Sequence, residues 1–367
     1  MHPDLVVLSH LRWPWVWQRP QHLVSRLARS RRTWFVEEPW PADVDEPRLR
    51  TEQHGEVTRV WLDVPAEGYL YFDHPSAAPY LQLLPELLGP ERDRIVWLYT
   101  ALALDLGQAL DPALLVFDVM DDLASFASAS PQHRLRHHRA LREADLVFTG
   151  GRSLHAGVTS VRTADVHLFP SGVEPEHYAP ARARRPATRP RPVAGYVGVV
   201  DERLDLELVA GLAAALPHWD VEVVGPVTKI GEDDLPRADN LRWLGGRPYD
   251  ELPAAMAGFD VALMPFARNE ATRSISPTKT LEYLAAGLPV VSTRIADVVA
   301  DHGSVVALAD DADGFAEHCR RLLEEREAPR PEVDAVLARS HWHAIARSMD
   351  ALMTRRLGAL DRTEASA

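Results

Sequence analysis

The sequence predicts an α/β protein with two doubly wound, mostly parallel sheets. Short apolar runs alternate with helical patterns in both halves of the chain, which is typical of parallel strands joined by crossover helices. A chain of 367 residues is too long for one ordinary domain and suits two of about 150–200 residues each. Because 46% of the residues are hydrophobic, the chain can fill two cores.

The first predicted domain covers residues 1–175 and begins with LVVLS (5–9), an apolar run typical of a buried parallel strand. Further strands are predicted at 34–38, 57–62, 95–99, 114–122, 146–150 and 166–170. Helical patterns separate the later strands at 101–110, 131–143 and 151–160. Residues 176–192 then contain five arginines and four prolines. With so few apolar side chains, we expect them to form a linker rather than part of a core.

The second predicted domain, 193–339, repeats the alternation of strands and helices. Its strands are predicted at 193–200, 221–226, 241–245, 261–266, 289–293 and 305–308. Helical patterns fall at about 203–216, 249–258, 277–286 and 311–325. An amphipathic closing helix is predicted over 340–358, behind the cap Ser340, and the polar tail 359–367 is expected to be disordered.

The composition excludes several classes of protein. A formal net charge of −13 argues against non-specific nucleic-acid binding, which requires a basic surface. The single cysteine, Cys319, excludes a disulfide framework and a cysteine metal site. The start MHPDLVVLSH lacks a basic leader followed by an apolar core, and no apolar run approaches the roughly 18 residues of a membrane span. We therefore expect a cytoplasmic protein.

The loop after the first strand, HLRWPWVWQRP (10–20), contains three tryptophans and two arginines. Loops that leave the carboxyl ends of parallel strands are where ligands gather in open sheets. Trp13, Trp15 and Trp17 therefore either form a stacking platform for a sugar or lipid acceptor or plug the gap between the two domains. The basic and aromatic stretch 12–34 is compatible with a peripheral contact to the inner face of a membrane, and equally with an ordinary amphipathic helix.

Three carboxylates in DVMDD (118–122) stand at the carboxyl end of a predicted central strand. A carboxylate that faces a cleft there is suited to act as a catalytic base, because burial raises its pKa toward the working range. Asp121 is the first candidate, since it lies just past the buried run, and Asp118 is the second. The alternative is that Asp121 or Asp122 is the N-cap of a following turn.

The stretch SISPTKTLEYLAAGLPVVST (274–293) is predicted to contain a loop, a short capped helix and a buried strand. Ser276 is suited to the N-cap, and Pro277 to the first helical position, where its missing N–H costs nothing. Gly287 can adopt the left-handed conformation that ends the helix.

The first turn of this helix is a predicted anion site, since its free N–H groups and its dipole favour a phosphate. Lys279 lies in that turn, and Glu282 follows three residues later on roughly the same face. A cation beside a hydrogen-bond acceptor suits a phosphorylated sugar or a nucleotide. The alternative is that the two residues form an exposed helical ion pair.

These features together resemble a GT-B glycosyltransferase, in which two Rossmann-like domains face each other across a cleft and a C-terminal helix returns to the first domain. The resemblance covers nearly the whole chain and is closest to the nucleotide-sugar-dependent family four enzymes, including those of bacterial polysaccharide and teichuronic-acid assembly. Its strongest part is LEYLAAGLPVVST (281–293), which is similar to a family segment whose glutamate holds the donor ribose. The resemblance therefore implies that Glu282 binds the ribose.

The remaining site residues are assigned largely from the same resemblance. GYVGVVDERLD (195–205) resembles the loop that reaches the donor diphosphate, and WLGGRPYDELPAAM (243–256) resembles the segment that holds the base. The loop 10–22 takes the place of the family's segment that meets the donor phosphate and the acceptor. We expect the diphosphate to contact Lys279, Arg203, Ser276 and Thr278, and the base to contact Gly246, Arg247 and Pro248. The donor sugar is expected to contact Ser274 and Ile275. The acceptor is expected to contact His10, Arg12, Trp15, Arg19 and His22.

One departure from the family concerns stereochemistry. Retaining members usually carry a second glutamate eight positions before the ribose-binding one, where this chain has Ser274. Glu270 is nearby but out of register. The sequence leaves open whether the sugar-binding role has moved into the loop 268–276, or whether the chain is an inverting branch with an aspartate base at 118–122.

The expected activity is the transfer of a sugar from a nucleotide-diphosphate donor, with a UDP-sugar favoured, to a hydroxyl of a polysaccharide, lipid-linked or secondary-metabolite acceptor. The nucleotide sugar is a substrate, so no cofactor is expected. No metal is expected either, because helix N–H groups, Lys279 and Arg203 can neutralise the leaving diphosphate. Two alternatives are a catalytically inert nucleotide-sugar-binding partner of another transferase, motivated by Ser274, and a nucleotide-sugar epimerase on the same scaffold.

Overall fold

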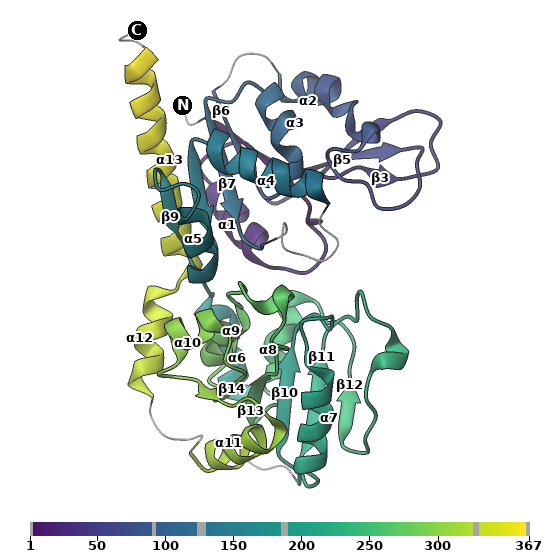
Figure 1. The fold of residues 1–367 in the computed structure, drawn as a ribbon, viewed down its shortest axis with the longest axis vertical. Coiled ribbons are helices and arrows are strands. Elements are labelled where there is room, and N and C mark those ends of the chain that lie inside the picture. Colours follow the sequence, from purple (N-terminus) through teal and green to yellow (C-terminus); the bar gives the residue numbers. More distant parts are fainter. Residues whose placement is uncertain (1–2, 90–92, 123–129, 185–189, 326–329, 365–367) are drawn as a thin grey trace. The chain divides into compact units, whose positions relative to one another are not determined.

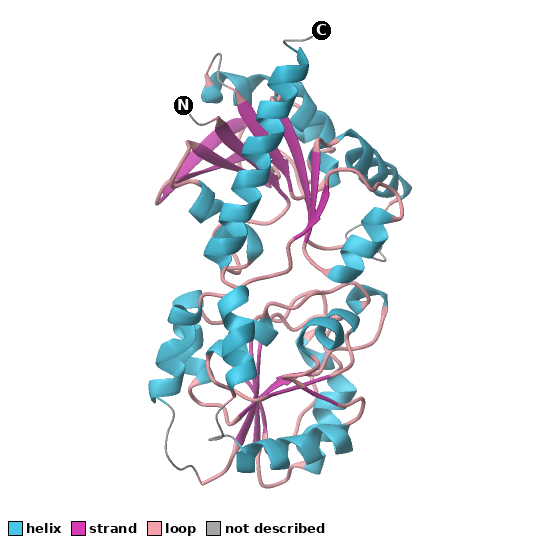
Figure 2. Ribbon diagram, turned by 90° about the vertical axis from the view of Figure 1, so that its left-hand side faces the viewer, coloured by secondary structure: helices cyan, strands magenta, loops and turns pink. Residues whose placement is uncertain are grey.

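The computed structural model describes residues 3–89, 93–122, 130–184, 190–325 and 330–364. The chain divides into two compact units. Unit 1 comprises Met1–Pro170 and His343–Ala367, and unit 2 comprises Ser171–Trp342. Each unit has a largely parallel sheet with helices on both faces (Figure 1 and Figure 2). The predicted α/β fold class is therefore confirmed, although the division falls after Pro170 rather than at 175.

The sheet of unit 1 has nine strands within the described residues. They are β1 (Asp4–Ser9), β2 (Thr33–Glu37), β3 (Trp40–Pro41), β4 (Arg48–His54), β5 (Val57–Val64), β6 (Arg94–Leu98), β7 (Leu114–Val119), β8 (Leu146–Thr149) and β9 (Val166–Leu168). Their order is β3-β5-β2-β1-β6-β7-β8-β9, with β4 paired antiparallel to β5. Because β1 lies between β2 and β6, the strand order reverses at β1, which is where ligands bind in open sheets.

The β4–β5 hairpin is absent from the sequence prediction. Residues 48–54 read RLRTEQH and remain mostly exposed, so they show no apolar run that would predict a strand. A two-residue turn joins the strands, because His54 pairs directly with Val57. Gly55 in that turn has φ 59°, a conformation that glycine adopts without strain.

Helices cover the sheet of unit 1. They are α1 (Arg19–Leu27), α2 (Tyr80–Leu88), α3 (Leu104–Ala109), α4 (Pro131–Glu143) and α5 (Arg152–Thr159), with short 3₁₀ turns η1 (Pro75–Ala77) and η2 (Ala101–Ala103). The start of α4 shows why these helices begin where they do. Pro131 takes the first helical position, and the Ser130 hydroxyl accepts a hydrogen bond of 3.1 Å from the His133 N–H.

Unit 2 has a six-stranded, entirely parallel sheet in the order β12-β11-β10-β13-β14-β15. Its strands are β10 (Val193–Val197), β11 (Asp220–Val224), β12 (Leu241–Trp243), β13 (Val261–Met264), β14 (Val290–Ser292) and β15 (Ala307–Leu308). Its helices are α6 (Pro175–Arg184), α7 (Leu206–Ala215), α8 (Leu252–Met256), α9 (Lys279–Ala285), α10 (Ala296–His302), α11 (Ala312–Glu325) and α12 (Pro331–Arg339), with 3₁₀ turns η3 (Glu232–Asp234), η4 (Tyr249–Glu251) and η5 (Glu270–Thr272). The strand order reverses at β10, between β11 and β13.

The prediction of a linker over 176–192 is wrong for its first part. Residues Pro175–Arg184 form α6, which packs against α8 and α9. Tyr178 and Ala181 are three residues apart on this helix and both are buried. Two apolar side chains at that spacing make a narrow helical face, which is sufficient for packing but too short to stand out among arginines and prolines. Residues 185–189 lie outside the described part of the chain.

The closing helix is longer than predicted. We expected it over 340–358 with a disordered tail, but α13 runs over Trp342–Glu364. From His343 onward it belongs to unit 1. The side chains that hold it there are the buried Met349 and Met353 and an ion pair between Asp350 and Arg31. The predicted return of the C-terminal helix to the first domain is confirmed.

Candidate functional site

The predicted anion site on α9 begins two residues later than expected. The helix starts at Lys279 with Thr278 as its N-cap residue, and no side chain caps it. The N–H groups of Leu281 and Glu282 donate to the Thr278 carbonyl at 3.0 and 3.2 Å. Ser276 therefore lies outside the helix, and its assignment as N-cap is wrong.

The end of this helix agrees with the prediction. Gly287 follows α9 with φ 73°, the left-handed conformation that favours glycine. A Cβ atom at this position would lie 2.5 Å from Nε of Arg182 on α6. The glycine therefore both ends α9 and allows α6 to pack closely against it.

Lys279 lies directly over the loop that follows β10. A Cβ atom on Gly198 would stand 1.9 Å from Cε and 2.8 Å from Nζ of Lys279. A Cβ atom on Gly225, which follows β11, would in turn stand 1.8 Å from the Gly198 carbonyl oxygen. Two glycines thus let the loops after β10 and β11 approach each other and let the lysine side chain cross them.

Four charged groups meet around Lys279. Burial lowers the pKa of Lys279, and Arg203 contributes to this shift while Glu282 and Asp201 oppose it. Burial also raises the pKa of Glu282, and Lys279, Tyr178 and Thr278 oppose that rise. The structure therefore brings together Lys279, Glu282 and Arg203, as the sequence predicted, and the exposed ion pair offered as the alternative does not form, since both helical residues are half-buried.

Arg203 is held in place by a residue that the sequence analysis missed. Asp201 is buried, and its two carboxylate oxygens accept hydrogen bonds from Nε and Nη2 of Arg203 at 2.7–3.1 Å. Such a two-point contact fixes the plane of the guanidinium. An acid two residues before an arginine, directly after a glycine-containing strand, is the sequence pattern that could have indicated this pair.

Aromatic residues from α6 and η4 surround Glu282. Tyr178 and Tyr249 lie beside its carboxylate. The Tyr249 hydroxyl donates to Glu174 at 3.2 Å, and the Tyr249 ring stacks on His177 with centroids 3.9 Å apart. These residues were missed because three of the four belong to segments read as linker or domain end.

The predicted base-binding loop borders a pocket. The Gly225 N–H donates to the Gly245 carbonyl at 2.9 Å, and a Cβ atom on Gly246 would lie 3.5 Å from Pro226. Arg247 is exposed and reaches Glu251 at 4.0 Å, while Pro248 precedes η4. The pocket measures about 490 Å³ and is lined by Gly225, Pro226, Val227, Glu232, Asp233, Leu235, Arg237, Trp243 and Gly245.

The loop expected to hold the donor sugar contains no buried carboxylate among its described side chains. Ser274 and Ile275 are half-buried. Glu270 lies on η5 and pairs with Arg273 at 3.2 Å, with both side chains largely exposed. Glu270 therefore does not replace the glutamate that is missing at Ser274.

In unit 1, the structure corrects two assignments at once. Asp118 is fully buried, and its two oxygens accept hydrogen bonds of 3.0 Å from Nε and Nη2 of Arg19. Arg19 is also buried and donates from Nη1 to the Phe169 carbonyl at 2.8 Å. Asp118 is thus not available as a base, nor Arg19 as an acceptor ligand, because each neutralises the other. Asp121 is half-buried near Arg19 and stays a prediction.

The acceptor loop divides into buried and accessible residues. His22 is buried and accepts from Trp17 Nε1 at 3.3 Å. Trp13 is buried against Phe35, with ring centroids 4.9 Å apart, so it fills the core of unit 1. Trp15 is 59% exposed and remains suited to stacking.

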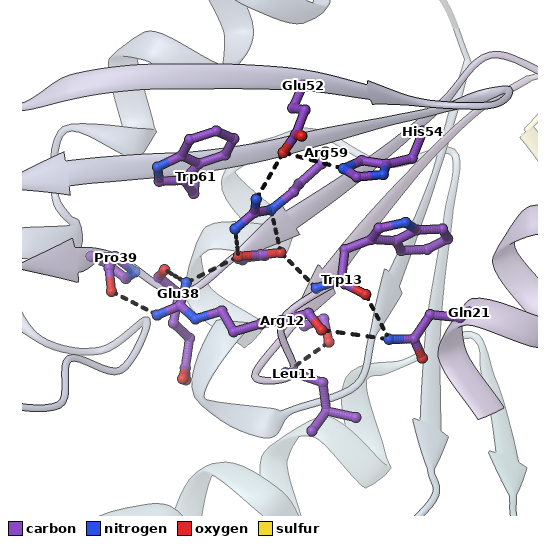
Figure 3. Close-up of polar contacts among 12 residues, drawn as sticks. Leu11, Arg12, Trp13, Gln21, Glu38, Pro39, Glu52, His54, Arg59 and Trp61 are labelled. Carbon is purple, nitrogen blue, oxygen red and sulfur yellow. Dashed lines mark hydrogen bonds and ion pairs between the residues drawn. The ribbon is translucent and has the colours of Figure 1, made fainter. Parts of the chain in front are cut away.

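His10 and Arg12 follow β1. Burial lowers the pKa of His10 to about 4, so the imidazole is neutral at pH 7. Arg12 donates to Glu37 at 3.3 Å and to the carbonyls of Glu38 and Pro39 (Figure 3). Arg12 thus ties the β1 loop to the end of β2 rather than facing solvent as an acceptor ligand.

Two adjacent glutamates at the end of β2 have opposite environments. Glu37 is buried and accepts four hydrogen bonds, from the Trp13 N–H at 2.7 Å, from Arg59 at 2.8 and 3.1 Å, and from Arg12 at 3.3 Å. Glu38 is also buried, yet neither of its oxygens has a hydrogen bond of good geometry. Burial raises the pKa of Glu38 to about 8.

The described residues contain neither a metal-binding cluster nor a membrane-spanning helix. No group of three or more His, Cys, Asp or Glu side chains there could hold a metal ion. No helix in the described part of the chain is both long and apolar enough to cross a membrane.

Comparison with solved structures defines the class of fold. Trehalose-6-phosphate synthase OtsA superposes with a TM-score of 0.70 at 14% identity, covering 96% of this chain and 99% of its own. The Anabaena protein HepE in complex with UDP gives a TM-score of 0.65 at 15% identity, covering 96% and 100%. The chain therefore has the GT-B fold with two Rossmann-like domains, and at these identities the likeness shows the fold alone.

Comparison with sequence families identifies unit 2 more specifically than the fold does. Residues 191–325 match the family described as "Glycosyl transferases group 1". This segment contains Arg203, Lys279 and Glu282 together with the pocket beside the base-binding loop. Unit 2 thus carries a glycosyl transferases group 1 domain.

Two curated relatives match part of the chain. TuaH of Bacillus subtilis (strain 168), named for a glycosyltransferase of teichuronic acid biosynthesis, is 31% identical over 168 residues, which are 43% of this chain and 42% of TuaH. The 2-deoxystreptamine glucosyltransferase of Streptomyces kanamyceticus is 28% identical over 197 residues, which are 49% of this chain and 50% of that enzyme. The chain thus spans half or less of the length of these relatives.

Proposed function

We propose that the chain is a glycosyltransferase that moves a sugar from a nucleotide-diphosphate donor to a hydroxyl of a polysaccharide, lipid-linked or secondary-metabolite acceptor. The observation that carries the proposal is the pair Lys279 and Glu282 on α9, with Lys279 packed over Gly198, inside the segment that matches the glycosyl transferases group 1 family. The names of both curated relatives support the reaction class. UDP is the favoured nucleotide, supported by the UDP complex of HepE.

The chemistry requires stabilisation of the leaving diphosphate. Lys279 and the guanidinium of Arg203 would supply positive charge, and a half-buried setting strengthens such interactions relative to water. Asp201 holds Arg203 in one orientation, so little reorganisation is needed when the charge develops. Thr278 and Ser276 precede the helix and would contact the phosphate oxygens. These two cations are our reason to propose a reaction without a metal ion.

Glu282 would bind the donor ribose. Its carboxylate accepts hydrogen bonds from hydroxyl groups, and the two ribose hydroxyls are donors of suitable geometry. Burial raises the pKa of the unliganded Glu282, and hydrogen bonds to the ionised form would lower it again. We therefore expect donor binding to stabilise the ionised form of Glu282.

The test is a thermal-shift titration with UDP, GDP, ADP and dTDP. A ligand that binds the folded state raises the melting temperature. We expect UDP to give the largest rise, and Lys279→Ala and Glu282→Ala to abolish it. The matched control is Lys229→Ala, which removes the other lysine of the chain, a residue that is 56% exposed. If no nucleoside diphosphate raises the melting temperature of the wild-type protein, the proposal fails.

The two lysines also allow a chemical readout. An amine-reactive reagent labels lysine side chains, and mass spectrometry of the peptides reports Lys229 and Lys279 separately. UDP is expected to protect Lys279 while labelling of Lys229 continues at an unchanged rate. Equal labelling of both residues with and without UDP would contradict the placement of the diphosphate.

One alternative has an observation in its favour. Ser274 replaces an acid of retaining relatives, and Glu270 is exposed instead of taking its place, which would suit an inert nucleotide-sugar-binding partner. Release of UDP from a UDP-sugar in the presence of acceptor separates the two, since the inert protein would bind donor without releasing UDP. The same experiment followed by NMR without acceptor would reveal an epimerase.

A further inference from the structure

Glu38 lies where three strand ends meet in unit 1. It follows β2 directly, and β2 pairs with β1 on one side and with β5 on the other. His10 follows β1, and Tyr69 and Tyr71 lie in the segment after β5. All these strands are parallel, so their carboxyl ends share the edge at which open sheets bind ligands.

Two charged neighbours of the Glu38 carboxylate, Arg12 and Asp73, bind other groups. In Figure 3 its side chain points away from Arg59 and Trp61. Arg12 attracts it, but the hydrogen bonds of Arg12 go to Glu37 and to the carbonyls of residues 38 and 39. Asp73 is also close to Glu38 and pairs with Arg136 at 2.5 Å. The Tyr69 hydroxyl and the Phe72 N–H also lie close to Glu38, but neither oxygen of this buried carboxylate has a hydrogen bond of good geometry.

Two exposed tyrosine rings lie at this edge of the sheet, Tyr69 beside Glu38 and Tyr71 against Tyr69. Tyr69 is 62% exposed and Tyr71 is 45% exposed, and their ring centroids are 5.0 Å apart. The Tyr69 hydroxyl lies beside Glu38 but donates to the His10 carbonyl at 3.4 Å. Exposed aromatic side chains change rotamer on the picosecond to nanosecond scale, so the Tyr69 ring can move from its place beside Glu38.

We propose that Glu38, Tyr69 and Tyr71 form a binding site for a saccharide that carries a protonated amine, and that this amino sugar is part of the acceptor. The second clause rests on the proposed glycosyltransferase function, whereas the first does not. Aromatic faces bind both the C–H face of a sugar ring and a cation. The carboxylate supplies the charge that selects the amine.

An ammonium group suits Glu38 better than a sugar hydroxyl does. A hydroxyl offers one donor and no charge, whereas an ammonium offers three donors and a full positive charge. Burying an ionised carboxylate is costly unless it is paired and hydrogen-bonded, and the ammonium meets both conditions. Binding would also convert a carboxyl whose pKa is raised by burial to its ionised form, so it would release a proton near neutral pH.

The experiment is saturation-transfer NMR on the full-length protein with glucosamine and glucose, which differ only in the amine. We expect glucosamine to bind about tenfold or more tightly than glucose, and Glu38→Gln to remove this preference. Tyr69→Ala should weaken glucosamine binding as well. The control is Glu86→Gln, since Glu86 is exposed on α2 and should leave the preference intact.

Three results would overturn the proposal. They are equal binding of glucose and glucosamine by the wild-type protein, no binding of either, and an unchanged preference in a Glu38→Gln protein that melts like the wild type. The nucleotide experiment is independent, because its residues all belong to unit 2. Failure of UDP binding with intact glucosamine preference would refute the glycosyltransferase and leave the amine site standing.

Discussion

The replacement Glu38→Gln should make the stability of unit 1 less dependent on pH. Burial raises the pKa of Glu38 from its ordinary value of 4.5 to about 8. Between these values the folded protein holds a proton that the unfolded chain has released, so the wild-type stability falls as pH rises through this window. At 1.36 kcal/mol per pKa unit, the loss by pH 8 is roughly 5 kcal/mol.

The stability of the Glu38→Gln variant relative to the wild type should therefore increase as pH rises. Glutamine keeps the shape of the side chain and cannot ionise, so the stability difference should grow by about 1.4 kcal/mol per pH unit and level off above pH 8. The neighbouring charges are those of Arg12 and Asp73. Tyr69 keeps its proton in this window, because burial raises its pKa to about 12.

Urea unfolding at pH 5, 6, 7 and 8 measures this difference. Tryptophan fluorescence reports mainly on unit 1, because seven of the ten tryptophans belong to it. Glu86→Gln serves as the control, and its unfolding free energy should differ from that of the wild type by the same amount at every pH. If the difference in unfolding free energy between Glu38→Gln and the wild type is also the same at every pH, then Glu38 ionises normally in the folded protein and the reasoning about its burial is wrong.

Three further substitutions test other contacts. Arg19→Met should destabilise unit 1 by about 3–5 kcal/mol in urea unfolding, because Asp118 would stay buried without its partner. Gly198→Ala would place a methyl carbon 1.9 Å from Cε of Lys279, so the UDP-dependent rise in melting temperature should be lost. Tyr178→Phe removes a hydroxyl beside the Glu282 carboxylate and should weaken UDP binding by roughly 1 kcal/mol in calorimetry.

The substitutions of Arg19 and Gly198 each have a matched control. Arg139→Met breaks two ion pairs, with Asp105 and Glu143, whose side chains are about a third exposed or more, and it should cost less than about 1 kcal/mol. Gly157→Ala adds a methyl group that meets no atom within 4 Å and should keep the UDP response. Equal effects of Arg19→Met and Arg139→Met would contradict the buried pair, and a normal UDP response of Gly198→Ala would contradict the placement of Lys279.

The sequence determined those features that depend on neighbours along the chain. Buried parallel strands are continuous apolar runs, so the strands of both sheets could be located, except for the exposed β4 and the two-residue β3. Lys279 and Glu282 could be paired because residues three apart share a helical face. Gly287 could be assigned as a helix terminator because few other residues tolerate its conformation.

The tertiary structure decided which side chains are available for chemistry. Asp118 was a reasonable base from its place at a strand end, but Arg19, 99 residues earlier, occupies both of its oxygens, and no local pattern encodes that pairing. Glu37 and Glu38 are identical neighbours in sequence. Successive side chains of a strand point to opposite sides, so one carboxylate meets two arginines and the other is buried without a hydrogen bond of good geometry. Only the packing of distant segments around β2 determines which of the two carboxylates keeps unused hydrogen-bonding capacity.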